Sequence, residues 1–131
     1  VLVAALGGQG GGVLNDWLVA AARIAGFPAQ STFIAGVAQR TGATTYYVEI
    51  WPEQEPRRPP EFCLFPSAGA VDLVVALEPM EAGRALRNGY VTAGTTVVTE
   101  AARTYSIAEK VVPGDGIAAV APVLAALEGA L

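Results

Sequence analysis

The residues with the clearest chemical potential are five glycines within positions 7 to 12. The segment reads Gly7-Gly8-Gln9-Gly10-Gly11-Gly12 and directly follows the apolar residues 1–6. Glycine tolerates positive φ and lets a ligand or another part of the backbone come close. A loop of this kind between a strand and a helix is where doubly wound α/β folds bind phosphate-bearing ligands.

This loop matches neither of the two common nucleotide motifs. It lacks the Lys-Ser/Thr pair that a P-loop carries after its glycines, which excludes a Walker-type site. Counted from Gly8, the dinucleotide fingerprint finds its third-position glycine in Gly10, but Val13 stands at the sixth position. The acid that would hold a ribose is also missing, because residues 33–35 at the end of the next predicted strand are apolar. A tight turn and a ligand or partner contact therefore both stay open.

A second candidate is the segment Gln39-Arg40-Thr41-Gly42, which follows the second predicted strand. An arginine beside glycines offers a planar fork of N–H donors to a carboxylate or phosphate. The alternative is an arginine paired with a surface acid, which contributes little to stability. Since both loops follow strands, we expect them at the same carboxyl-end edge of the sheet, where ligands gather in open α/β folds.

No complete catalytic constellation is visible in the chain. There is no histidine, and the one cysteine, Cys63, lies between apolar neighbours, so we expect a buried, inert thiol. One cysteine cannot hold an iron–sulfur cluster, which wants four thiolates. Glu49 and Glu78 are candidate general bases, but the sequence shows no partner that would perturb them. Gly114-Asp115-Gly116 is interpreted as a turn, because the asparagine that completes a thiamine diphosphate motif does not follow it.

Apolar segments with strand-like and helix-like spacing alternate along the chain. Strands are predicted at residues 1–6, 29–34, 44–51, 62–65, 72–77 and 95–99. Helices are predicted at residues 13–24, 80–87 and 117–131, the first from the helical spacing of Val13, Trp17, Ala20, Ala21 and Ile24. Gly26 and Asn88-Gly89 are predicted to end the first two helices, and Pro122 must start a turn or kink the last.

This alternation predicts an α/β fold, namely a Rossmann-like, doubly wound, mostly parallel sheet with helices on both faces. Residues 1–131 are long enough for one domain with a real core. Because the chain starts at Val1 inside a strand, we expect it to be a fragment or a trimmed part of a longer protein.

The amino-acid composition indicates which classes of partner the chain can bind. Hydrophobic residues make up 53% of the chain and charged residues only 15%, which favours docking against other polypeptides. A net charge of −4 argues against nucleic-acid binding. No apolar stretch approaches the roughly 20 residues of a membrane span, so we expect no membrane partner. A single cysteine fits a reducing, cytoplasmic location.

Three stretches form a pattern when they are read together, namely Leu6-Gly7-Gly8-Gln9-Gly10-Gly11, Gly36-Val37-Ala38-Gln39-Arg40-Thr41-Gly42 and residues 72–82. They resemble the gamma subunit (domain III) of 2-oxoacid:ferredoxin oxidoreductases, the pyruvate/ketoisovalerate type of catalytic domain. The two loops are fairly specific as a pair, and the resemblance runs in order over most of the chain. The segment 103–110, followed by Gly114-Asp115-Gly116, is most similar to the indolepyruvate oxidoreductase beta-subunit branch.

The resemblance implies a multi-subunit enzyme that oxidatively decarboxylates a 2-oxoacid to an acyl-CoA and passes electrons to ferredoxin. It implies no cofactor in this chain, with thiamine diphosphate, Mg²⁺, [4Fe-4S] clusters and CoA on partner subunits and no activity of the chain alone. A homodimer is a further option. The residues that would help to close the substrate/CoA site are Gly7, Gly8, Gln9, Gly10, Gly11, Gln39, Arg40 and Gly42.

Two other functions remain open. The chain could be a free-standing dinucleotide- or flavin-binding module, or a purely structural assembly subunit. The chain also departs from the family, whose members are longer and carry a C-terminal segment with asparagine and glycine that is missing here.

Overall fold

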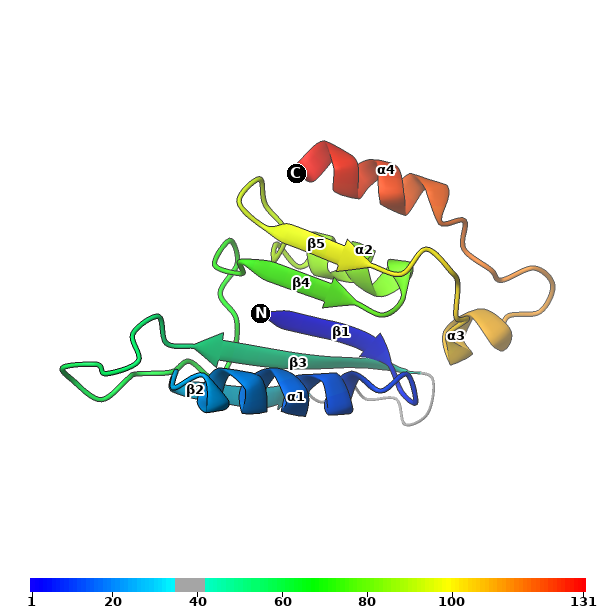
Figure 1. The fold of residues 1–131 in the computed structure, drawn as a ribbon. Helices are drawn as coiled ribbons and strands as arrows, with labels where there is room; N and C mark the ends of the chain where they lie inside the picture. The colour runs from blue at the N-terminus through cyan, green and yellow to red at the C-terminus, as the bar shows by residue number, and fades with distance from the viewer. Residues whose placement is uncertain (35–41) are drawn as a thin grey trace.

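A computed structural model describes residues 1–34 and 42–131 (Figure 1). The described part contains a five-stranded sheet in the order β2-β3-β1-β4-β5. The strands are β1 (Leu2–Leu6), β2 (Ala29–Ile34), β3 (Ala43–Ile50), β4 (Leu73–Ala76) and β5 (Thr96–Thr99). The helices are α1 (Gly11–Ile24), α2 (Pro79–Arg87), α3 (Ile107–Lys110) and α4 (Ala121–Ala130).

The sheet is mixed but mostly parallel. Strand β1 pairs in parallel with β4, and β4 pairs in parallel with β5. Strand β3 runs antiparallel to both β1 and β2, so the other four strands share one direction. This arrangement confirms the predicted Rossmann-like α/β class and adds one reversed strand.

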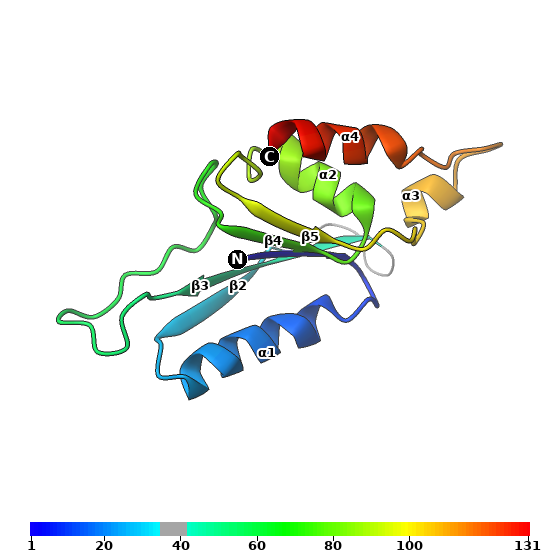
Figure 2. The ribbon, with the colours of Figure 1, turned by 45° about the horizontal axis from the view of Figure 1, so that its top comes forward.

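Helices cover both faces of the sheet, as Figure 2 shows: α1 lies on one face and α2 with α4 on the other. The chain leaves β1 through α1 toward β2 at one side of the sheet, and leaves β4 through α2 toward β5 at the other. Because right-handed crossovers in opposite directions place their helices on opposite faces, the winding reverses between β1 and β4. The carboxyl ends of these two strands therefore flank the crevice at which open α/β sheets bind ligands.

Glycines end the first two long helices, as predicted. Gly26 has a φ of 88° and donates its N–H to Arg23 O at 3.0 Å, while Phe27 N–H reaches Ala22 O at 2.9 Å. Gly89, with a φ of 77°, ends α2 with the same pair of bonds. In both helices the glycine stands one residue beyond the cap, where a left-handed backbone lets the last carbonyls find donors.

Residues 62–65 were predicted as a strand, and this prediction is wrong. Thr32 Oγ1 donates to Leu64 O at 2.7 Å and Gln30 Nε2 donates to Cys63 O at 3.3 Å. Two side chains of β2 thus hold this segment through its carbonyls, so it lies across the sheet face without joining the backbone ladder. The apolar composition that suggested a strand is largely exposed, with Leu64 and Phe65 each 64% accessible.

The C-terminal part differs from the predicted single helix over residues 117–131. Helix α4 begins only at Ala121, and Pro122 stands in its first turn, where its missing N–H is not needed. The short helix α3 was not predicted, although its start carries a capping box. Ser106 Oγ accepts the Glu109 N–H, and the Glu109 carboxylate accepts the Ser106 N–H.

The apolar stripe that indicated α1 points away from the sheet. Val13, Trp17 and Ile24 are 53%, 69% and 88% exposed. The buried positions of the helix are Gly11, Asn15 and Ala22. Helical spacing correctly predicted the element, but the face that it selected is not the one that packs on this chain's own sheet.

Close packing of α1 on the sheet depends on Gly11. A Cβ at this position would lie 2.9 Å from Ala5 Cβ and 3.2 Å from Tyr46 Cε2. Ala5 is fully buried in the middle strand, so it has no room to move away. The glycine therefore sets the distance between α1 and β1.

We predict that Gly11→Ala lowers the free energy of unfolding by about 1–3 kcal/mol, because overpacking forces the helix off the sheet. Chemical denaturation measures the change. The matched control is Gly129→Ala in α4, where an added Cβ meets nothing within 4 Å. The control should be neutral or stabilising by up to about 1 kcal/mol, since alanine is the better helix former. A Gly11→Ala protein as stable as the wild type would contradict this account of the glycine.

Candidate functional site

The glycine loop turns the chain at the carboxyl end of β1, where the winding of the sheet reverses. Gly8 and Gly10 have φ values of 94° and 85°, in the left-handed region that favours glycine. The Gln9 N–H closes a turn on Leu6 O at 3.1 Å. Space for a larger residue exists at both glycines, since an added Cβ would meet nothing within 4 Å. Backbone conformation, and not crowding, therefore requires glycine here.

The side chain of Gln9 bridges the two strands that flank this reversal. Its Oε1 accepts the Leu6 N–H at 2.7 Å, and its Nε2 donates to Leu77 O at 3.0 Å. Leu77 directly follows β4, and its own N–H donates to Ala4 O at 2.8 Å. The Gln9 amide thus occupies the crevice in which a doubly wound fold would hold the polar part of a ligand.

A hydrogen bond joins the first residue of the glycine loop to the last residue of the second loop. Gly7 N–H donates to Gly42 O at 2.9 Å, and Gly42 is buried directly before β3. This contact brings the end of the second loop against the first at the same edge of the sheet. Gln39 and Arg40, the other predicted site residues of that loop, lie outside the described residues.

Helix α1 begins at this edge without a side-chain cap among the described residues. Gly10 is the N-cap residue, and no acidic residue stands in the first turn. The N–H groups of the first turn of any helix have no partner within the helix, and they carry a partial positive charge. The loop therefore presents backbone donors at the edge and no charged side chain of its own.

A shallow hollow of about 470 Å³ opens beside the loop, at the carboxyl ends of β4 and β5. Gln9, Leu77 and Thr99 line it together with Glu100. The Glu100 carboxylate accepts the N–H groups of Ala102 and Ala101, and these two bonds lower its pKa. The hollow thus combines an apolar strand face with one exposed carboxylate.

A buried ionic cluster lies behind this edge. Arg103 Nε donates to Glu78 Oε1 and its Nη2 donates to Glu109 Oε1, each at 2.5 Å, while Nη1 reaches Ala118 O. The three side chains are only 11%, 1% and 13% exposed. Glu78 also caps α2 by accepting the Met80 N–H at 2.6 Å. The cluster therefore ties α3 and the segment before α4 to the junction between β4 and α2.

The Glu109 carboxylate shows how strongly this cluster favours charge. Burial alone would raise its pKa, but hydrogen bonds from Arg103, from the backbone and side chain of Ser106, and from the Ala118 N–H outweigh it. The pKa of Glu109 falls from 4.5 to about 2. Arg103 thus pairs with both carboxylates of the cluster, and these contacts indicate a structural role.

The other titratable candidates are also accounted for. Cys63 is exposed, so the prediction of a buried thiol is wrong, because its segment crosses the sheet face instead of joining it. Glu49 accepts hydrogen bonds from Tyr47 Oη at 2.7 Å and from Cys63 N at 2.5 Å. Glu78 is held by Arg103. Neither carboxylate is placed to act as a general base.

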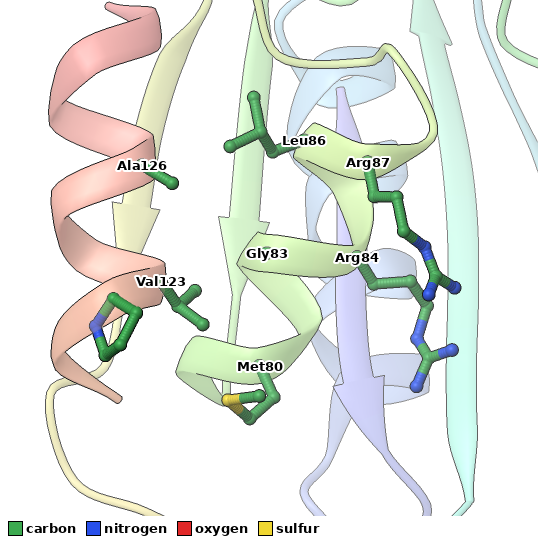
Figure 3. Close-up of a pocket in the computed structure, with 8 residues that line it drawn as sticks. Met80, Gly83, Arg84, Leu86, Arg87, Val123 and Ala126 are labelled. Atoms are coloured by element: carbon green, nitrogen blue, oxygen red, sulfur yellow. The ribbon is translucent and has the colours of Figure 1, made fainter. Parts of the chain in front are cut away.

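A second hollow, of about 370 Å³, lies between α2 and α4 (Figure 3). Its floor is apolar, and Figure 3 shows Arg84 and Arg87 on the side of α2 away from α4. Arg84 is paired with Glu81 at 3.0 Å. A Cβ at Gly83 would lie 2.7 Å from Val123 Cγ1, so the two helices touch closely here. The hollow is a packing groove that lacks convergent polar groups, unlike the edge of the sheet.

Residues 1–34 and 42–131 include no group of three or more His, Cys, Asp or Glu that could hold a metal ion. None of the helices in the same ranges has both the length and the apolarity that crossing a bilayer requires.

Taken together, fold and site define a Rossmann-like α/β domain whose two motif loops join at the reversal of the sheet. The chain belongs to the pyruvate ferredoxin/flavodoxin oxidoreductase family, whose model matches residues 1–128. This match supports the resemblance to 2-oxoacid:ferredoxin oxidoreductases and an oxidoreductase activity. No curated protein and no solved structure matches the chain.

The ionic cluster was missed in the sequence. The pattern Ser106-x-x-Glu109 is a signal for a helix start and could have located α3. No local signal links Arg103 to Glu78, because the two are 25 residues apart. Their pairing depends on the path of the chain after β5.

We predict that Arg103→Met lowers the free energy of unfolding by about 3–5 kcal/mol near neutral pH, because two buried carboxylates lose their partner. The difference from the wild type should shrink as the pH falls from 4.5 to about 2. A carboxylate with a depressed pKa stabilises the fold above its unfolded pKa and loses this contribution on protonation. Denaturant titrations over that pH range measure the effect. Arg87→Met, which changes an exposed arginine of α2, is the control and should stay within about 0.5 kcal/mol.

We predict that Gln9→Glu destabilises the protein by about 1–3 kcal/mol. The substitution keeps the shape but replaces the donor to Leu77 O by a second acceptor oxygen. Thermal or chemical unfolding measures the loss. Gln54→Glu is the control: Gln54 also donates its amide to a carbonyl, Ala25 O at 2.8 Å, but at an exposed position. Equal losses in the two variants would show that the bridge between β1 and β4 has no special weight.

Proposed function

We propose that this chain is the gamma-type domain of a 2-oxoacid:ferredoxin oxidoreductase of the indolepyruvate branch. Such an enzyme uses thiamine diphosphate and iron–sulfur clusters to convert a 2-oxoacid to an acyl-CoA, and ferredoxin takes the electrons. The observation that carries the proposal is the hydrogen bond between Gly7 and Gly42. It brings the two motif loops of a family member together at the edge where α/β sheets bind ligands.

In this proposal the loops form one wall of the substrate/CoA site. The Gln9 amide is already hydrogen-bonded to Leu6 and Leu77, so the loop contacts a ligand or partner mainly through its backbone. Gly8 and Gly10 let that backbone come close to a ligand or to a partner subunit. The uncapped start of α1 adds N–H donors that favour an anionic group. Arg40 supplies a full positive charge to the same group.

The reactive groups would belong to partner polypeptides. The single cysteine cannot supply the four thiolates of a [4Fe-4S] cluster. Among the described residues no carboxylate cluster fits the Mg²⁺ that accompanies thiamine diphosphate. The residues of this chain therefore do not fit either group, and its part is to bind, orient and exclude water beside a neighbour in the cytoplasm.

Two alternatives compete with this proposal. A free-standing dinucleotide- or flavin-binding module is disfavoured because Gln9 fills the crevice that the ligand would enter. A purely structural assembly subunit is favoured by the exposed apolar residues of α1. It predicts that both loops tolerate substitution as long as the complex forms.

Purification of the chain from its native source tests the assembly. We expect a polypeptide that carries thiamine diphosphate and iron–sulfur clusters to come along, which absorbance and metal analysis would show. Recovery of the chain without such a partner, together with a thermal shift on adding NAD or FAD, would instead establish the binding module.

Kinetics of the assembled enzyme test the site. Arg40→Ala should lower turnover or CoA affinity about tenfold to hundredfold, the range expected when a charge-assisted hydrogen bond to an anion is lost. Arg58→Ala, in the exposed segment after β3, is the matched control and should leave the kinetics unchanged. If both variants behave like the wild type, Arg40 has no place in the site.

A further inference from the structure

Two large apolar surfaces remain exposed on the same side of the sheet. The first is the α1 stripe, formed by Val13, Trp17, Ala20 and Ile24. The second, which we call the open sheet face, consists of the side chains of β4 and β5 that point to the α1 side. Its members are Leu73, Val75, Leu77, Thr96 and Val98.

Register and packing show on which side the open sheet face lies. Gly11 of α1 sits over Ala5, so Ala5 faces α1, and Val3 two residues earlier in the strand does the same. Val3 is paired with Val75, and Val75 with Val98. These two residues therefore point to the side that α1 occupies.

Helix α1 does not reach these strands. It packs against β1, β2 and β3, whereas α2 packs against β1, β4 and β5 from the other side. Val74 is fully buried under α2, but Val75 is only partly buried, and Val98 is 54% exposed. Parallel strands that carry apolar side chains on both faces normally have helices on both faces. Half of this face lacks its helix among the described residues.

The α1 stripe is an exposed apolar surface that a sheet could cover. At 100° per residue, Val13, Trp17, Ala20 and Ile24 fall within about 60° of one another, opposite to buried Asn15. Helix α1 therefore has an apolar face toward its own sheet and a second one that points outward. A helix that is apolar on opposite faces is typical of one packed between two layers.

The flank of α1 that looks toward β4 carries no charge either. Leu14, Leu18 and Ala21 lie on this flank, while the charged Asp16 and Arg23 lie on the flank toward β2. Arg23 and Asp16 line a hollow with Ser31 of β2, which fixes the orientation of the helix. The apolar surface thus continues from the stripe across the flank to the open sheet face.

We propose that the occupant of this surface is a second copy of the same chain. The α1 stripe can be covered by a sheet face, and the open sheet face can be covered by a helix. In a dimer with a two-fold axis parallel to α1, each copy covers both of these surfaces on its partner. Each α1 lays its stripe on the open sheet face of the partner, and the two α1 helices run parallel, side by side, between the two sheets. The interface is isologous, as closed dimers require.

The area favours this interleaved arrangement over stripe against stripe. Helix α1 has 14 residues, so its footprint is about 20 Å by 10 Å, or roughly 200 Å² in projection. The interleaved pair covers two such footprints on each copy and adds the apolar flanks. Stripe against stripe covers one footprint and leaves the open sheet face exposed. Two footprints are roughly 400 Å² in projection, or half of the about 800 Å² per partner that stable interfaces bury, and the apolar flanks must supply the rest. One footprint reaches only about a quarter of that area.

Disulfide cross-linking of the full chain tests the contact. All variants carry Cys63→Ser, which removes the native thiol. Ala21→Cys lies on the flank next to the two-fold axis and should cross-link to itself under mild oxidation, because parallel helices bring equal positions together. Ala20→Cys, which faces the partner's sheet, should not. Ala125→Cys, exposed on α4 beyond the other sheet face, is the negative control.

Sedimentation over a concentration series tests the energetics. Trp17→Glu and Val98→Glu alter the two surfaces separately, and each should raise the dimer dissociation constant at least about thirtyfold, as for a central interface residue. Leu64→Glu, at an exposed apolar residue on the opposite face, should leave it unchanged. Val98 lines the hollow beside the glycine loop, but the proposed function rests on the hydrogen bond between Gly7 and Gly42, so failure of the dimer leaves the proposed function untouched.

Four results would overturn the proposal. One is a monomer at every concentration, and another is a dimer that survives either Trp17→Glu or Val98→Glu. A third is cross-linking through Ala20→Cys and not Ala21→Cys, which would show stripe against stripe. The fourth is cross-linking of Ala21→Cys to a different polypeptide in the assembled enzyme, which would show that another subunit covers this surface.

Discussion

The burial of β1 is the constraint on which the rest of the structure depends. All five of its residues are buried, between an antiparallel partner on one side and a parallel partner on the other. A strand enclosed on both edges and both faces has no freedom of register, because a shift by one residue would exchange its two faces. The alanines Ala4 and Ala5 let layers on both sides approach closely. The chain must therefore leave β1 through a turn that fits this fixed frame, and the glycine loop provides it.

The fixed position of β1 also explains why polar side chains near the glycine loop stabilise the fold instead of remaining free for a ligand. Gln9 satisfies two backbone groups that the reversal of the sheet would otherwise leave without partners. Arg103 neutralises two buried carboxylates and holds the path of the chain after β5. Such clusters are costly to form, but once formed they accept only one arrangement of their members. The edge gains a fixed shape, which the proposed function of positioning groups that belong to a neighbour would require.

Much of this fold could be predicted from the sequence, and the failures have physical reasons. The β-branched run of β3 and the glycines after α1 and α2 act locally, so their effects were visible. Residues 62–65 have strand-like composition, but side chains of β2 bind their carbonyls on the sheet face, so the segment does not extend the free edge of that strand. Periodicity shows which residues of α1 share a face, but not whether that face meets its own sheet or another molecule. At the site, the meeting of the loops followed from topology, whereas the bridging role of Gln9 required coordinates.

The exposure of Cys63 has a practical consequence. It is the sole thiol of the chain, and it sits in a segment anchored through carbonyls on the face opposite to α1. A maleimide dye or nitroxide attached there would report on tumbling and on intermolecular distances without entering the glycine loops or the α1 stripe. These 131 residues thus already carry a single, well-placed site for attaching a spectroscopic label.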